Sequence, residues 1–139
     1  MKKILYLIAV LSILGITGSS CRVRSLNGDL DAQWQLMTVE TPNSTVTPQA
    51  IYYAFYRHTA NFRPGTTTAN LTYNEDTKNL TLEFPVVASR SGNQEGTSLD
   101  RYYIPDKIPC TVNFKVIKLT SKQLIMTLDD NTTYPFRKF

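Results

Sequence analysis

Few residues in this sequence combine the types and spacing that catalysis requires. The one histidine, His58, could act as a general base, but its neighbours Arg57 and Thr59 are not acids, and we interpret it as a surface histidine. Cys110 follows Pro109 at a strand start, far from His58 in the chain, so we interpret it as a buried, inert thiol. A Gly-x-Ser-x-Gly nucleophile motif and a glycine-rich phosphate loop are both absent from the sequence. We therefore expect the protein not to be an enzyme.

Two pairs of adjacent carboxylates, Glu75-Asp76 and Asp129-Asp130, are the candidates for a metal site. Calcium loops of the EF-hand type place ligands at alternating positions and end on a glutamate, and neither pair has that spacing. Zinc-finger sites need four Cys or His ligands, whereas the chain has two Cys and one His. We interpret both pairs as turn residues and expect no metal and no cofactor.

The first 21 residues have the order of segments found in an export signal. Two lysines follow Met1, an apolar run covers residues 4–16, and the small residues 17–20 precede Cys21. The segment Gly18-Ser19-Ser20-Cys21 resembles a bacterial lipoprotein processing site. The resemblance implies that residues 1–20 are a cleaved signal peptide. It also implies that Cys21 carries a diacylglyceryl thioether and fatty acyl chains such as palmitate, and that residues 21–30 form the lipidated tether. The alternative is an ordinary cysteine beside a plain signal-peptidase site.

The charge of the mature chain limits its partners. Without residues 1–20, and therefore without Lys2 and Lys3, the chain has 13 basic and 11 acidic residues, a formal net charge of +2. The basic residues are scattered, so we expect no nucleic-acid partner. Arg22 and Arg24 follow the anchor and would lie against anionic headgroups. The segment lacks the acidic run that directs some Gram-negative lipoproteins to the outer surface. We therefore expect a cell-envelope protein, lipid-anchored to the outer membrane and facing the periplasm.

The rest of the chain shows period-2 alternation rather than helical periodicity. No stretch after residue 30 keeps an i, i+3, i+4, i+7 apolar pattern for more than two turns. Trp34 and Leu36 share one strand face, and Tyr134 and Phe136 share another. Seven strands are expected at residues 32–40, 51–57 (resuming around 61–62), 67–73, 80–84, 110–119, 123–128 and 134–139, with a short eighth strand at 101–104.

These strands follow one another in hairpin order. They make seven or eight antiparallel strands in about 110 residues, and such a sheet must hide its edges to avoid aggregation. Closure into a barrel removes the edges, and eight strands leave an interior wide enough for side chains or one small ligand. The sequence therefore predicts an all-β fold, a small antiparallel up-and-down barrel, with a two-sheet sandwich as the rival architecture.

Three short motifs carry a resemblance to a known family. They are LDAQWQL at residues 30–36, LIMTL at 124–128 and YPFRK at 134–138. They resemble the first strand and the closing hairpin of lipocalin-like domains in small bacterial lipoproteins, an uncharacterised Gram-negative envelope group. The resemblance covers residues 28–139. It implies a lipocalin-like β-barrel domain at residues 31–139, with a mouth that can admit a ligand.

Binding of a small molecule is the function that this interpretation favours. Arg57 continues the inward face of residues 51–55 toward the strand end, where with Arg63, Arg101 or a Tyr hydroxyl it could pair with a carboxylate. Inward-facing aromatic side chains would line the interior, and the alternative is that they simply fill it. We expect a fatty-acid-like or other amphipathic ligand in or at the mouth of the barrel, bound by Trp34, Tyr53, Phe55, Arg57 and Arg101.

A second function class is an envelope interaction module with a filled barrel. Tyrosine is favoured at interfaces because its flat ring adds contact area at low entropy cost. A ligand carrier requires a cavity in the barrel, whereas an interaction module requires an aromatic surface patch. The patch would contact an envelope protein or glycan, with loop 85–106 as the binding edge and with Tyr52, Tyr56, Tyr102 and Tyr103 exposed.

Overall fold

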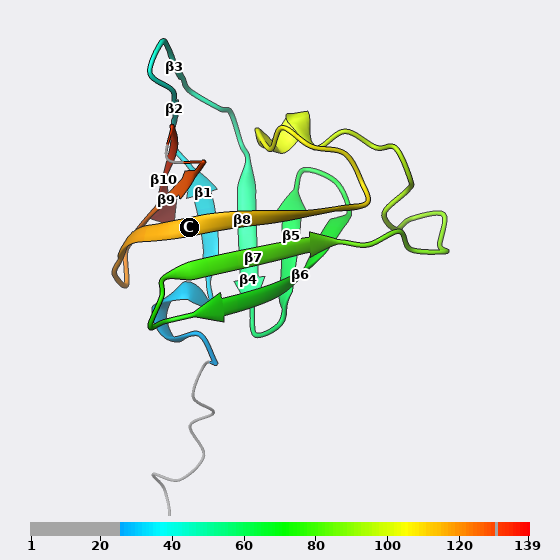
Figure 1. The fold of residues 1–139 in the computed structure, drawn as a ribbon, viewed down its shortest axis with the longest axis horizontal. Coiled ribbons are helices and arrows are strands. Elements are labelled where there is room, and N and C mark those ends of the chain that lie inside the picture. The colour runs from blue at the N-terminus through cyan, green and yellow to red at the C-terminus, as the bar shows by residue number, and fades with distance from the viewer. Residues whose placement is uncertain (1–25, 130) are drawn as a thin grey trace, which may run out of the picture.

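The computed structural model describes residues 26–129 and 131–139. Within them, one antiparallel sheet curls round until its first strand meets its last (Figure 1). β1 pairs with β4 on one side and with β10 on the other, which closes eight strands into a barrel. The predicted all-β antiparallel barrel is confirmed. The expected signal peptide at residues 1–20 and the lipidation site Cys21 lie outside the described residues.

The barrel strands follow the chain in meander order, interrupted once by a short hairpin, β2–β3, that attaches to β10. Two short 3₁₀ turns, η1 and η2, pack against the ends of the barrel. The elements are η1 (Gly28–Leu30), β1 (Gln33–Leu36), β2 (Val39–Glu40), β3 (Thr45–Val46), β4 (Tyr52–Tyr56), β5 (Thr59–Arg63), β6 (Thr67–Asn74), β7 (Asn79–Phe84), η2 (Asp100–Tyr102), β8 (Cys110–Leu119), β9 (Gln123–Leu128) and β10 (Thr132–Lys138).

Alternation along each strand decides which side chains fill the barrel. Trp34 and Leu36 are buried on the inner face of β1, and Tyr134 and Phe136 are buried on the inner face of β10, as the sequence predicted. The described hydrophobic core lies entirely between Leu30 and Phe136. A chain that begins at residue 22 therefore contains that whole core.

Two expected strands differ in the structure. The strand expected at residues 32–40 divides, because the chain leaves the barrel after Leu36 and β2 pairs with β3 and β10 instead. The strand expected at residues 101–104 is wrong, because η2 occupies this position and buries Tyr102. A short apolar run signals burial but does not specify the backbone that achieves it.

One end of the barrel is formed by η1, by the turns that follow β4 and β8, and by the carboxyl terminus. We call it the amino-terminal end, because η1 precedes the first strand. The Arg57 N–H donates to Asp31 Oδ1 at 3.0 Å, which joins the turn after β4 to η1. The Lys138 N–H donates to the Lys122 carbonyl at 2.9 Å, which joins the last strand to the turn between β8 and β9. Residues before β1 are thus part of the folded domain: Leu30, expected in the tether, is 0% exposed.

The opposite end, which we call the mouth, is covered by residues 97–109, which we call the plug. The plug includes η2 and appears as the yellow segment near the top of Figure 1. The Tyr102 hydroxyl donates to the Pro64 carbonyl at 2.6 Å and so joins the plug to the turn between β5 and β6. The buried side chains of the plug are Leu99, Tyr102, Ile104 and Ile108.

Candidate functional site at the mouth of the barrel

The barrel interior is occupied by its own side chains. Trp34 and Tyr53 are 0% exposed and Phe55 is 2% exposed, so these three predicted ligand contacts lie inside the core. The Trp34 Nε1–H donates to the Leu30 carbonyl at 3.0 Å, which satisfies the polar atom of the indole. The rings of Tyr53 and Phe136 pack with their centroids 4.9 Å apart. A ligand in the interior would have to displace this packing.

Two buried tyrosine hydroxyls hold the plug in place. Tyr53 donates to the Tyr102 carbonyl, and Tyr134 donates to the Tyr103 carbonyl at 2.7 Å. Burial raises the pKa of Tyr53 well above its usual value of 10.0, and the neighbouring Tyr134 and Tyr102 hydroxyls add to the shift. Burial, with a smaller effect of the Asp129 charge, raises the pKa of Tyr134 to about 12. Both hydroxyls therefore stay protonated near neutral pH and act as fixed donors.

Arg57 lies at the amino-terminal end, in the turn after β4. That strand ends at Tyr56, and Arg57 has a left-handed backbone with φ of 55°. Its exposed side chain does not continue the inward face of residues 51–55, contrary to the sequence prediction. Its carbonyl accepts from Asn27 Nδ2 at 2.7 Å, so the backbone of Arg57 helps to hold the segment before β1 onto the barrel.

Arg101 lies at the mouth, on the plug. Its guanidinium carbon is 5.5 Å from the centroid of the Tyr102 ring, within range of a cation–π interaction. Arg63 ends β5, beside the turn that the plug contacts. The structure brings Arg63 and Arg101 to the same end of the barrel, but it does not bring Arg57 and Arg101 together. One ligand carboxylate cannot contact both.

Sequence reasoning missed the plug. Its four buried residues are spaced irregularly and match neither the strand nor the helix period. A buried asparagine in the preceding loop ties the connection to the barrel, because Asn93 Nδ2 donates to the Thr68 carbonyl at 2.6 Å and to the Pro85 carbonyl at 3.0 Å. Large apolar residues within an otherwise polar, turn-rich segment were the available signal.

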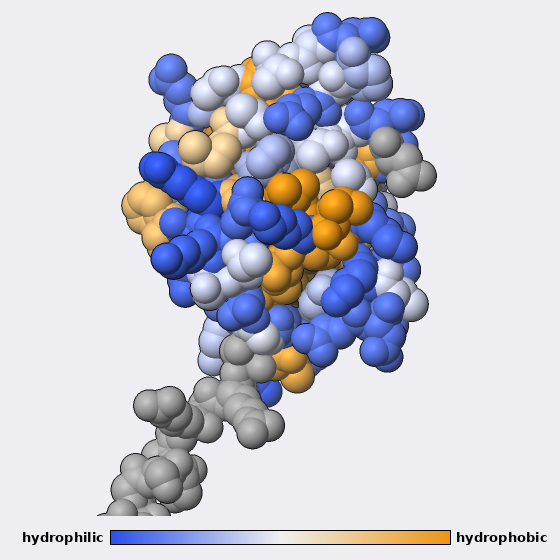
Figure 2. Space-filling view, turned by 90° about the vertical axis from the view of Figure 1, so that its left-hand side faces the viewer, coloured by the Kyte–Doolittle hydropathy of each residue, from blue (hydrophilic) through white to orange (hydrophobic). Residues whose placement is uncertain are grey.

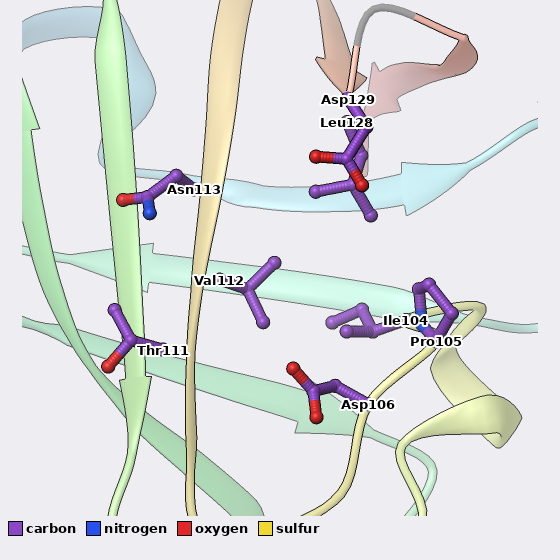
Figure 3. A pocket seen from close by; sticks show the side chains of 8 residues that line it. All are labelled: Ile104, Pro105, Asp106, Thr111, Val112, Asn113, Leu128 and Asp129. Carbon is purple, nitrogen blue, oxygen red and sulfur yellow. The ribbon is translucent and has the colours of Figure 1, made fainter.

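A groove of about 230 Å³ runs between the plug and the barrel wall (Figure 3). Its apolar part comes from Ile104 of the plug, Val112 of β8 and Leu128 of β9. Asp106 and Asp129 bring carboxylates to it from the plug and from the turn after β9, and Figure 3 shows Ile104 between them. The lining is completed by Pro105, Thr111 and Asn113.

Two further grooves adjoin the plug, and Pro105 borders both of them as well as the first. One measures about 280 Å³ and lies between the plug and the ends of β2 and β10. The other measures about 390 Å³ and is open to solvent on the outer side of the plug. Besides Pro105, the 280 Å³ groove is lined by Val39, Thr41, Asp100, Tyr103, Thr132 and Tyr134. The 390 Å³ groove is lined by Pro105 and by Ser98, Asp100, Asp106 and Lys107.

Carboxylates dominate the charge of these three grooves. Asp100, Asp106 and Asp129 line them, and Lys107 is the one basic lining residue. Cys110 begins β8, as the sequence predicted, but it is partly exposed rather than buried. Burial, with the smaller effects of the Asp106 charge and hydrogen bond, raises the pKa of the Cys110 thiol to about 11. The thiol is therefore protonated and a weak nucleophile near neutral pH.

The four tyrosines expected on a partner surface are spread over the molecule. Tyr102 is 0% exposed, whereas Tyr56 is 63% exposed. Tyr52 and Tyr56 point outward from β4, and Tyr103 borders a groove at the mouth. These side chains do not form one exposed patch.

No group of three or more His, Cys, Asp or Glu side chains is placed to hold a metal ion within residues 26–129 and 131–139. The described part of the chain also contains no helix that is long and apolar enough to cross a membrane.

Comparison with known proteins identifies one family. A family model described as a lipocalin-like domain matches residues 14–139. A solved lipocalin-like protein from Bacteroides uniformis is 19% identical, with a TM-score of 0.61 over 81% of this chain and 100% of that protein. An uncharacterized protein from Bacteroides eggerthii is 15% identical, with a TM-score of 0.57 over 78% of this chain and 98% of that protein. At these identities the likeness concerns the fold alone. No curated protein matches the chain.

Proposed function

Because this chain belongs to the lipocalin-like domain family, we propose that it binds a small amphipathic ligand, and that it does so at the plugged mouth rather than in the lumen. The observation that carries the proposal is that three grooves meet at Pro105 while the interior is packed with side chains. Binding sites of this kind combine an apolar surface with a few polar groups that orient the ligand.

The chemistry of the first groove favours a ligand that carries a cation or several hydrogen-bond donors. Ile104, Val112 and Leu128 offer apolar contact, and the carboxylates of Asp106 and Asp129 accept hydrogen bonds on either side. Hydrogen bonds to charged groups contribute about 1.5–3 kcal/mol each. A fatty-acid-like ligand, held by Arg57, would need the opposite end of the barrel.

We also propose that the protein is a lipid-anchored lipoprotein of the cell envelope, attached to the outer membrane through Cys21 and facing the periplasm. The small residues before Cys21 and the apolar run before them support the anchor. Diacylglyceryl and acyl chains on one residue give stable attachment, because two lipid signals suffice where one does not. The domain would then act by binding near the membrane, without catalysis.

An NMR titration of the anchor-free chain, beginning at residue 22, tests the binding site. The probes are dodecylamine and dodecanoate, which share an alkyl chain and differ in headgroup charge. Dodecylamine should shift the backbone amides of Ile104, Val112 and Asp129, and should leave the Trp34 indole N–H unchanged. Asp106→Asn with Asp129→Asn should weaken dodecylamine binding at least about tenfold.

The matched control removes two carboxylates at the amino-terminal end, with Asp29→Asn and Asp76→Asn, and should leave binding unchanged. Preferential binding of dodecanoate, with shifts at Trp34 and loss on Arg57→Ala, would replace the proposal with a lumen site. Absence of binding by either probe would favour the second candidate, a larger envelope protein or glycan on the same mouth. The filled interior and the partly exposed Tyr103 at the groove are the observations that favour that candidate.

The anchor has a separate test. The intact protein should partition into the membrane fraction, and its mass should include lipid on Cys21. Cys21→Ser should release it into the soluble fraction. A membrane-fraction protein with no added lipid mass would contradict the lipid anchor.

A further inference from the structure

Five neighbouring strands of the barrel carry basic residues and no acidic ones, and the nearest strand carboxylates are Glu40 of β2, opposite Thr133, and Glu83 of β7, opposite Thr111. β8, β9, β10, β1 and β4 are neighbours in the sheet, and none of their described residues is Asp or Glu. The same strands carry Lys115, Lys118, Arg137 and Lys138, and Lys122 lies in the turn between β8 and β9, all of them exposed. Such one-sided charge attracts anionic partners.

A β-bulge places an apolar side chain and a cation together on this side. Val116 of β8 is buried opposite Met126, and the register shifts before Lys118 pairs with Ile125. Regular alternation would turn residue 118 into the barrel, but the bulge leaves both Ile117 and Lys118 exposed. Ile117 is 60% exposed, so the bulge presents a large apolar side chain on the outer face of β8.

The exposed apolar and basic residues lie side by side across the strands. Ile125 is opposite Lys118 on one flank and Pro135 on the other. Arg137 lies beside Gln35 of β1, and its Nε–H donates to Gln35 Oε1 at 2.9 Å.

At the carboxyl terminus of this side, Phe139 is 69% exposed, and its ring meets the edge of Tyr52 at a centroid distance of 4.8 Å. In Figure 2, which views the molecule from the left-hand side of Figure 1, hydrophobic residues gather in the middle of this side among hydrophilic ones. We call the surface formed by the cations Lys118, Lys122 and Arg137 and by the apolar residues Ile117, Ile125 and Phe139 the basic side.

We propose that the basic side lies against an anionic lipid surface, with its cations on the headgroups and with Ile117 and Phe139 reaching the boundary of the acyl chains. Charge complementarity is the first argument, because each Lys or Arg near an anionic leaflet adds to binding. The second is the mixture itself, since surfaces that lie in the membrane interface combine Lys and Arg with exposed large apolar residues. In this orientation the barrel lies on its side wall, so the mouth would face along the membrane surface rather than into it.

The position of the basic side in the chain agrees with this orientation, although that point rests on the proposed lipid anchor. Leu26, the first described residue, is 50% exposed and follows Cys21 by five positions. Lys122 and Lys138 lie at the same amino-terminal end of the barrel, where their backbones are hydrogen-bonded. An anchored domain could therefore lie down on its basic side while the mouth remains open to the periplasm.

Vesicle co-sedimentation of the anchor-free chain, beginning at residue 22, tests the surface without the lipid on Cys21. The chain should bind vesicles of phosphatidylglycerol and phosphatidylethanolamine, bind phosphatidylcholine vesicles far more weakly, and lose binding as salt increases. Lys118→Glu with Lys122→Glu should weaken binding at least about 25-fold, from roughly fivefold for each removed charge. Ile117→Ser with Phe139→Ser should weaken it about tenfold at unchanged net charge.

The matched control, Arg63→Glu with Arg90→Glu, makes the same change of net charge outside the basic side. Lys107→Glu, also outside it, measures how much one charge reversal weakens binding through net charge alone. Once that general effect is subtracted, the control pair should bind vesicles as the wild type does. Lys122→Glu alone, in an exposed turn, keeps the test valid if the double variant fails to fold. Three results would overturn the proposal. The first is no binding to anionic vesicles, and the second is an equal loss of binding in the two charge-reversal pairs. The third is binding to soluble polyphosphate that is as strong as binding to vesicles and is unchanged by Ile117→Ser. None of them would affect the dodecylamine titration at the mouth, so the two proposals fail separately.

Discussion

Tyr53 shows how one side chain can serve both the core and the mouth. Its ring is fully buried among aromatic residues, while its hydroxyl donates to the Tyr102 carbonyl of the plug. A buried carbonyl without a donor costs more than an ordinary hydrogen bond gains. Residues that sequence reasoning assigned to a ligand thus bind the protein's own backbone.

Tyr53→Phe should lower the free energy of unfolding by about 1–3 kcal/mol, because the Tyr102 carbonyl loses a buried donor. Tyr56→Phe makes the same change at a residue that is 63% exposed, and should alter it by less than about 0.5 kcal/mol. Urea denaturation of the anchor-free chain measures both. Equal, small effects would mean that this hydroxyl does not hold the plug.

The raised pKa of Tyr134 predicts a loss of stability in alkali. Its pKa rises from 10.0 to about 12 on folding, so between these pH values the unfolded chain releases a proton that the folded chain retains. The contribution is fully present below pH 10 and is lost as the pH rises toward 12. Urea denaturation at a series of pH values should show the decline, and Tyr134→Phe should make it shallower. Parallel declines in the two proteins would contradict the assignment to Tyr134.

At the scale of elements, the strands and the plug differ in how far sequence could predict them. β8 and β9 have the predicted bounds because alternation and a Thr120-Ser121-Lys122 turn specify them locally. The plug has no local period, and its conformation depends on contacts with Pro64, Tyr53 and Tyr134, which lie far away in the sequence. The strand expected within it failed for this reason.

Tyr102→Ala should open the mouth. Truncation of a fully buried aromatic residue costs about 3–5 kcal/mol, and here it also removes the hydroxyl that donates to Pro64. We expect a lower midpoint in urea and increased binding of a hydrophobic fluorescent dye to the folded protein. Val87→Ala, in the same connection but 37% exposed, is the control and should do neither. An unchanged dye signal with intact stability would show that the plug does not seal the barrel.

At the scale of the whole molecule, closure of the sheet joins its first strand, β1, to its last barrel strand, β10. β10 pairs with β9 over residues 132–137 and also with β1, which in turn pairs with β4. Closure removes the open edges that would otherwise recruit other chains. It also brings the groove carboxylates Asp100, Asp106 and Asp129 to the mouth and spreads the basic side over β8, β9 and β10.

Removal of residues 132–139 should abolish cooperative folding, because it exposes the edges of β1 and β9 and deletes Tyr134 and Phe136 from the core. We expect loss of a sharp unfolding transition and aggregation in size-exclusion chromatography. Removal of Phe139 alone leaves every strand intact and should preserve both the transition and the monomer peak. A cooperative transition in the longer truncation would mean that the barrel does not need closure.

The sequence by itself determined the class of fold, the faces of the main strands and the absence of any recognisable catalytic motif. These follow from alternation, turn residues and motif spacing, which are short-range properties that extend over about ten residues. The inward faces carrying Trp34, Tyr53 and Phe55 are confirmed in this way.

Only the tertiary structure decided that the interior is filled, that Arg57 and Arg101 lie at opposite ends, and that the grooves surround a plug. Each of these depends on the volume enclosed by the closed sheet and on contacts between residues distant in the chain. Alternation states which side chains point inward, but whether they leave space is decided by how all of them pack together.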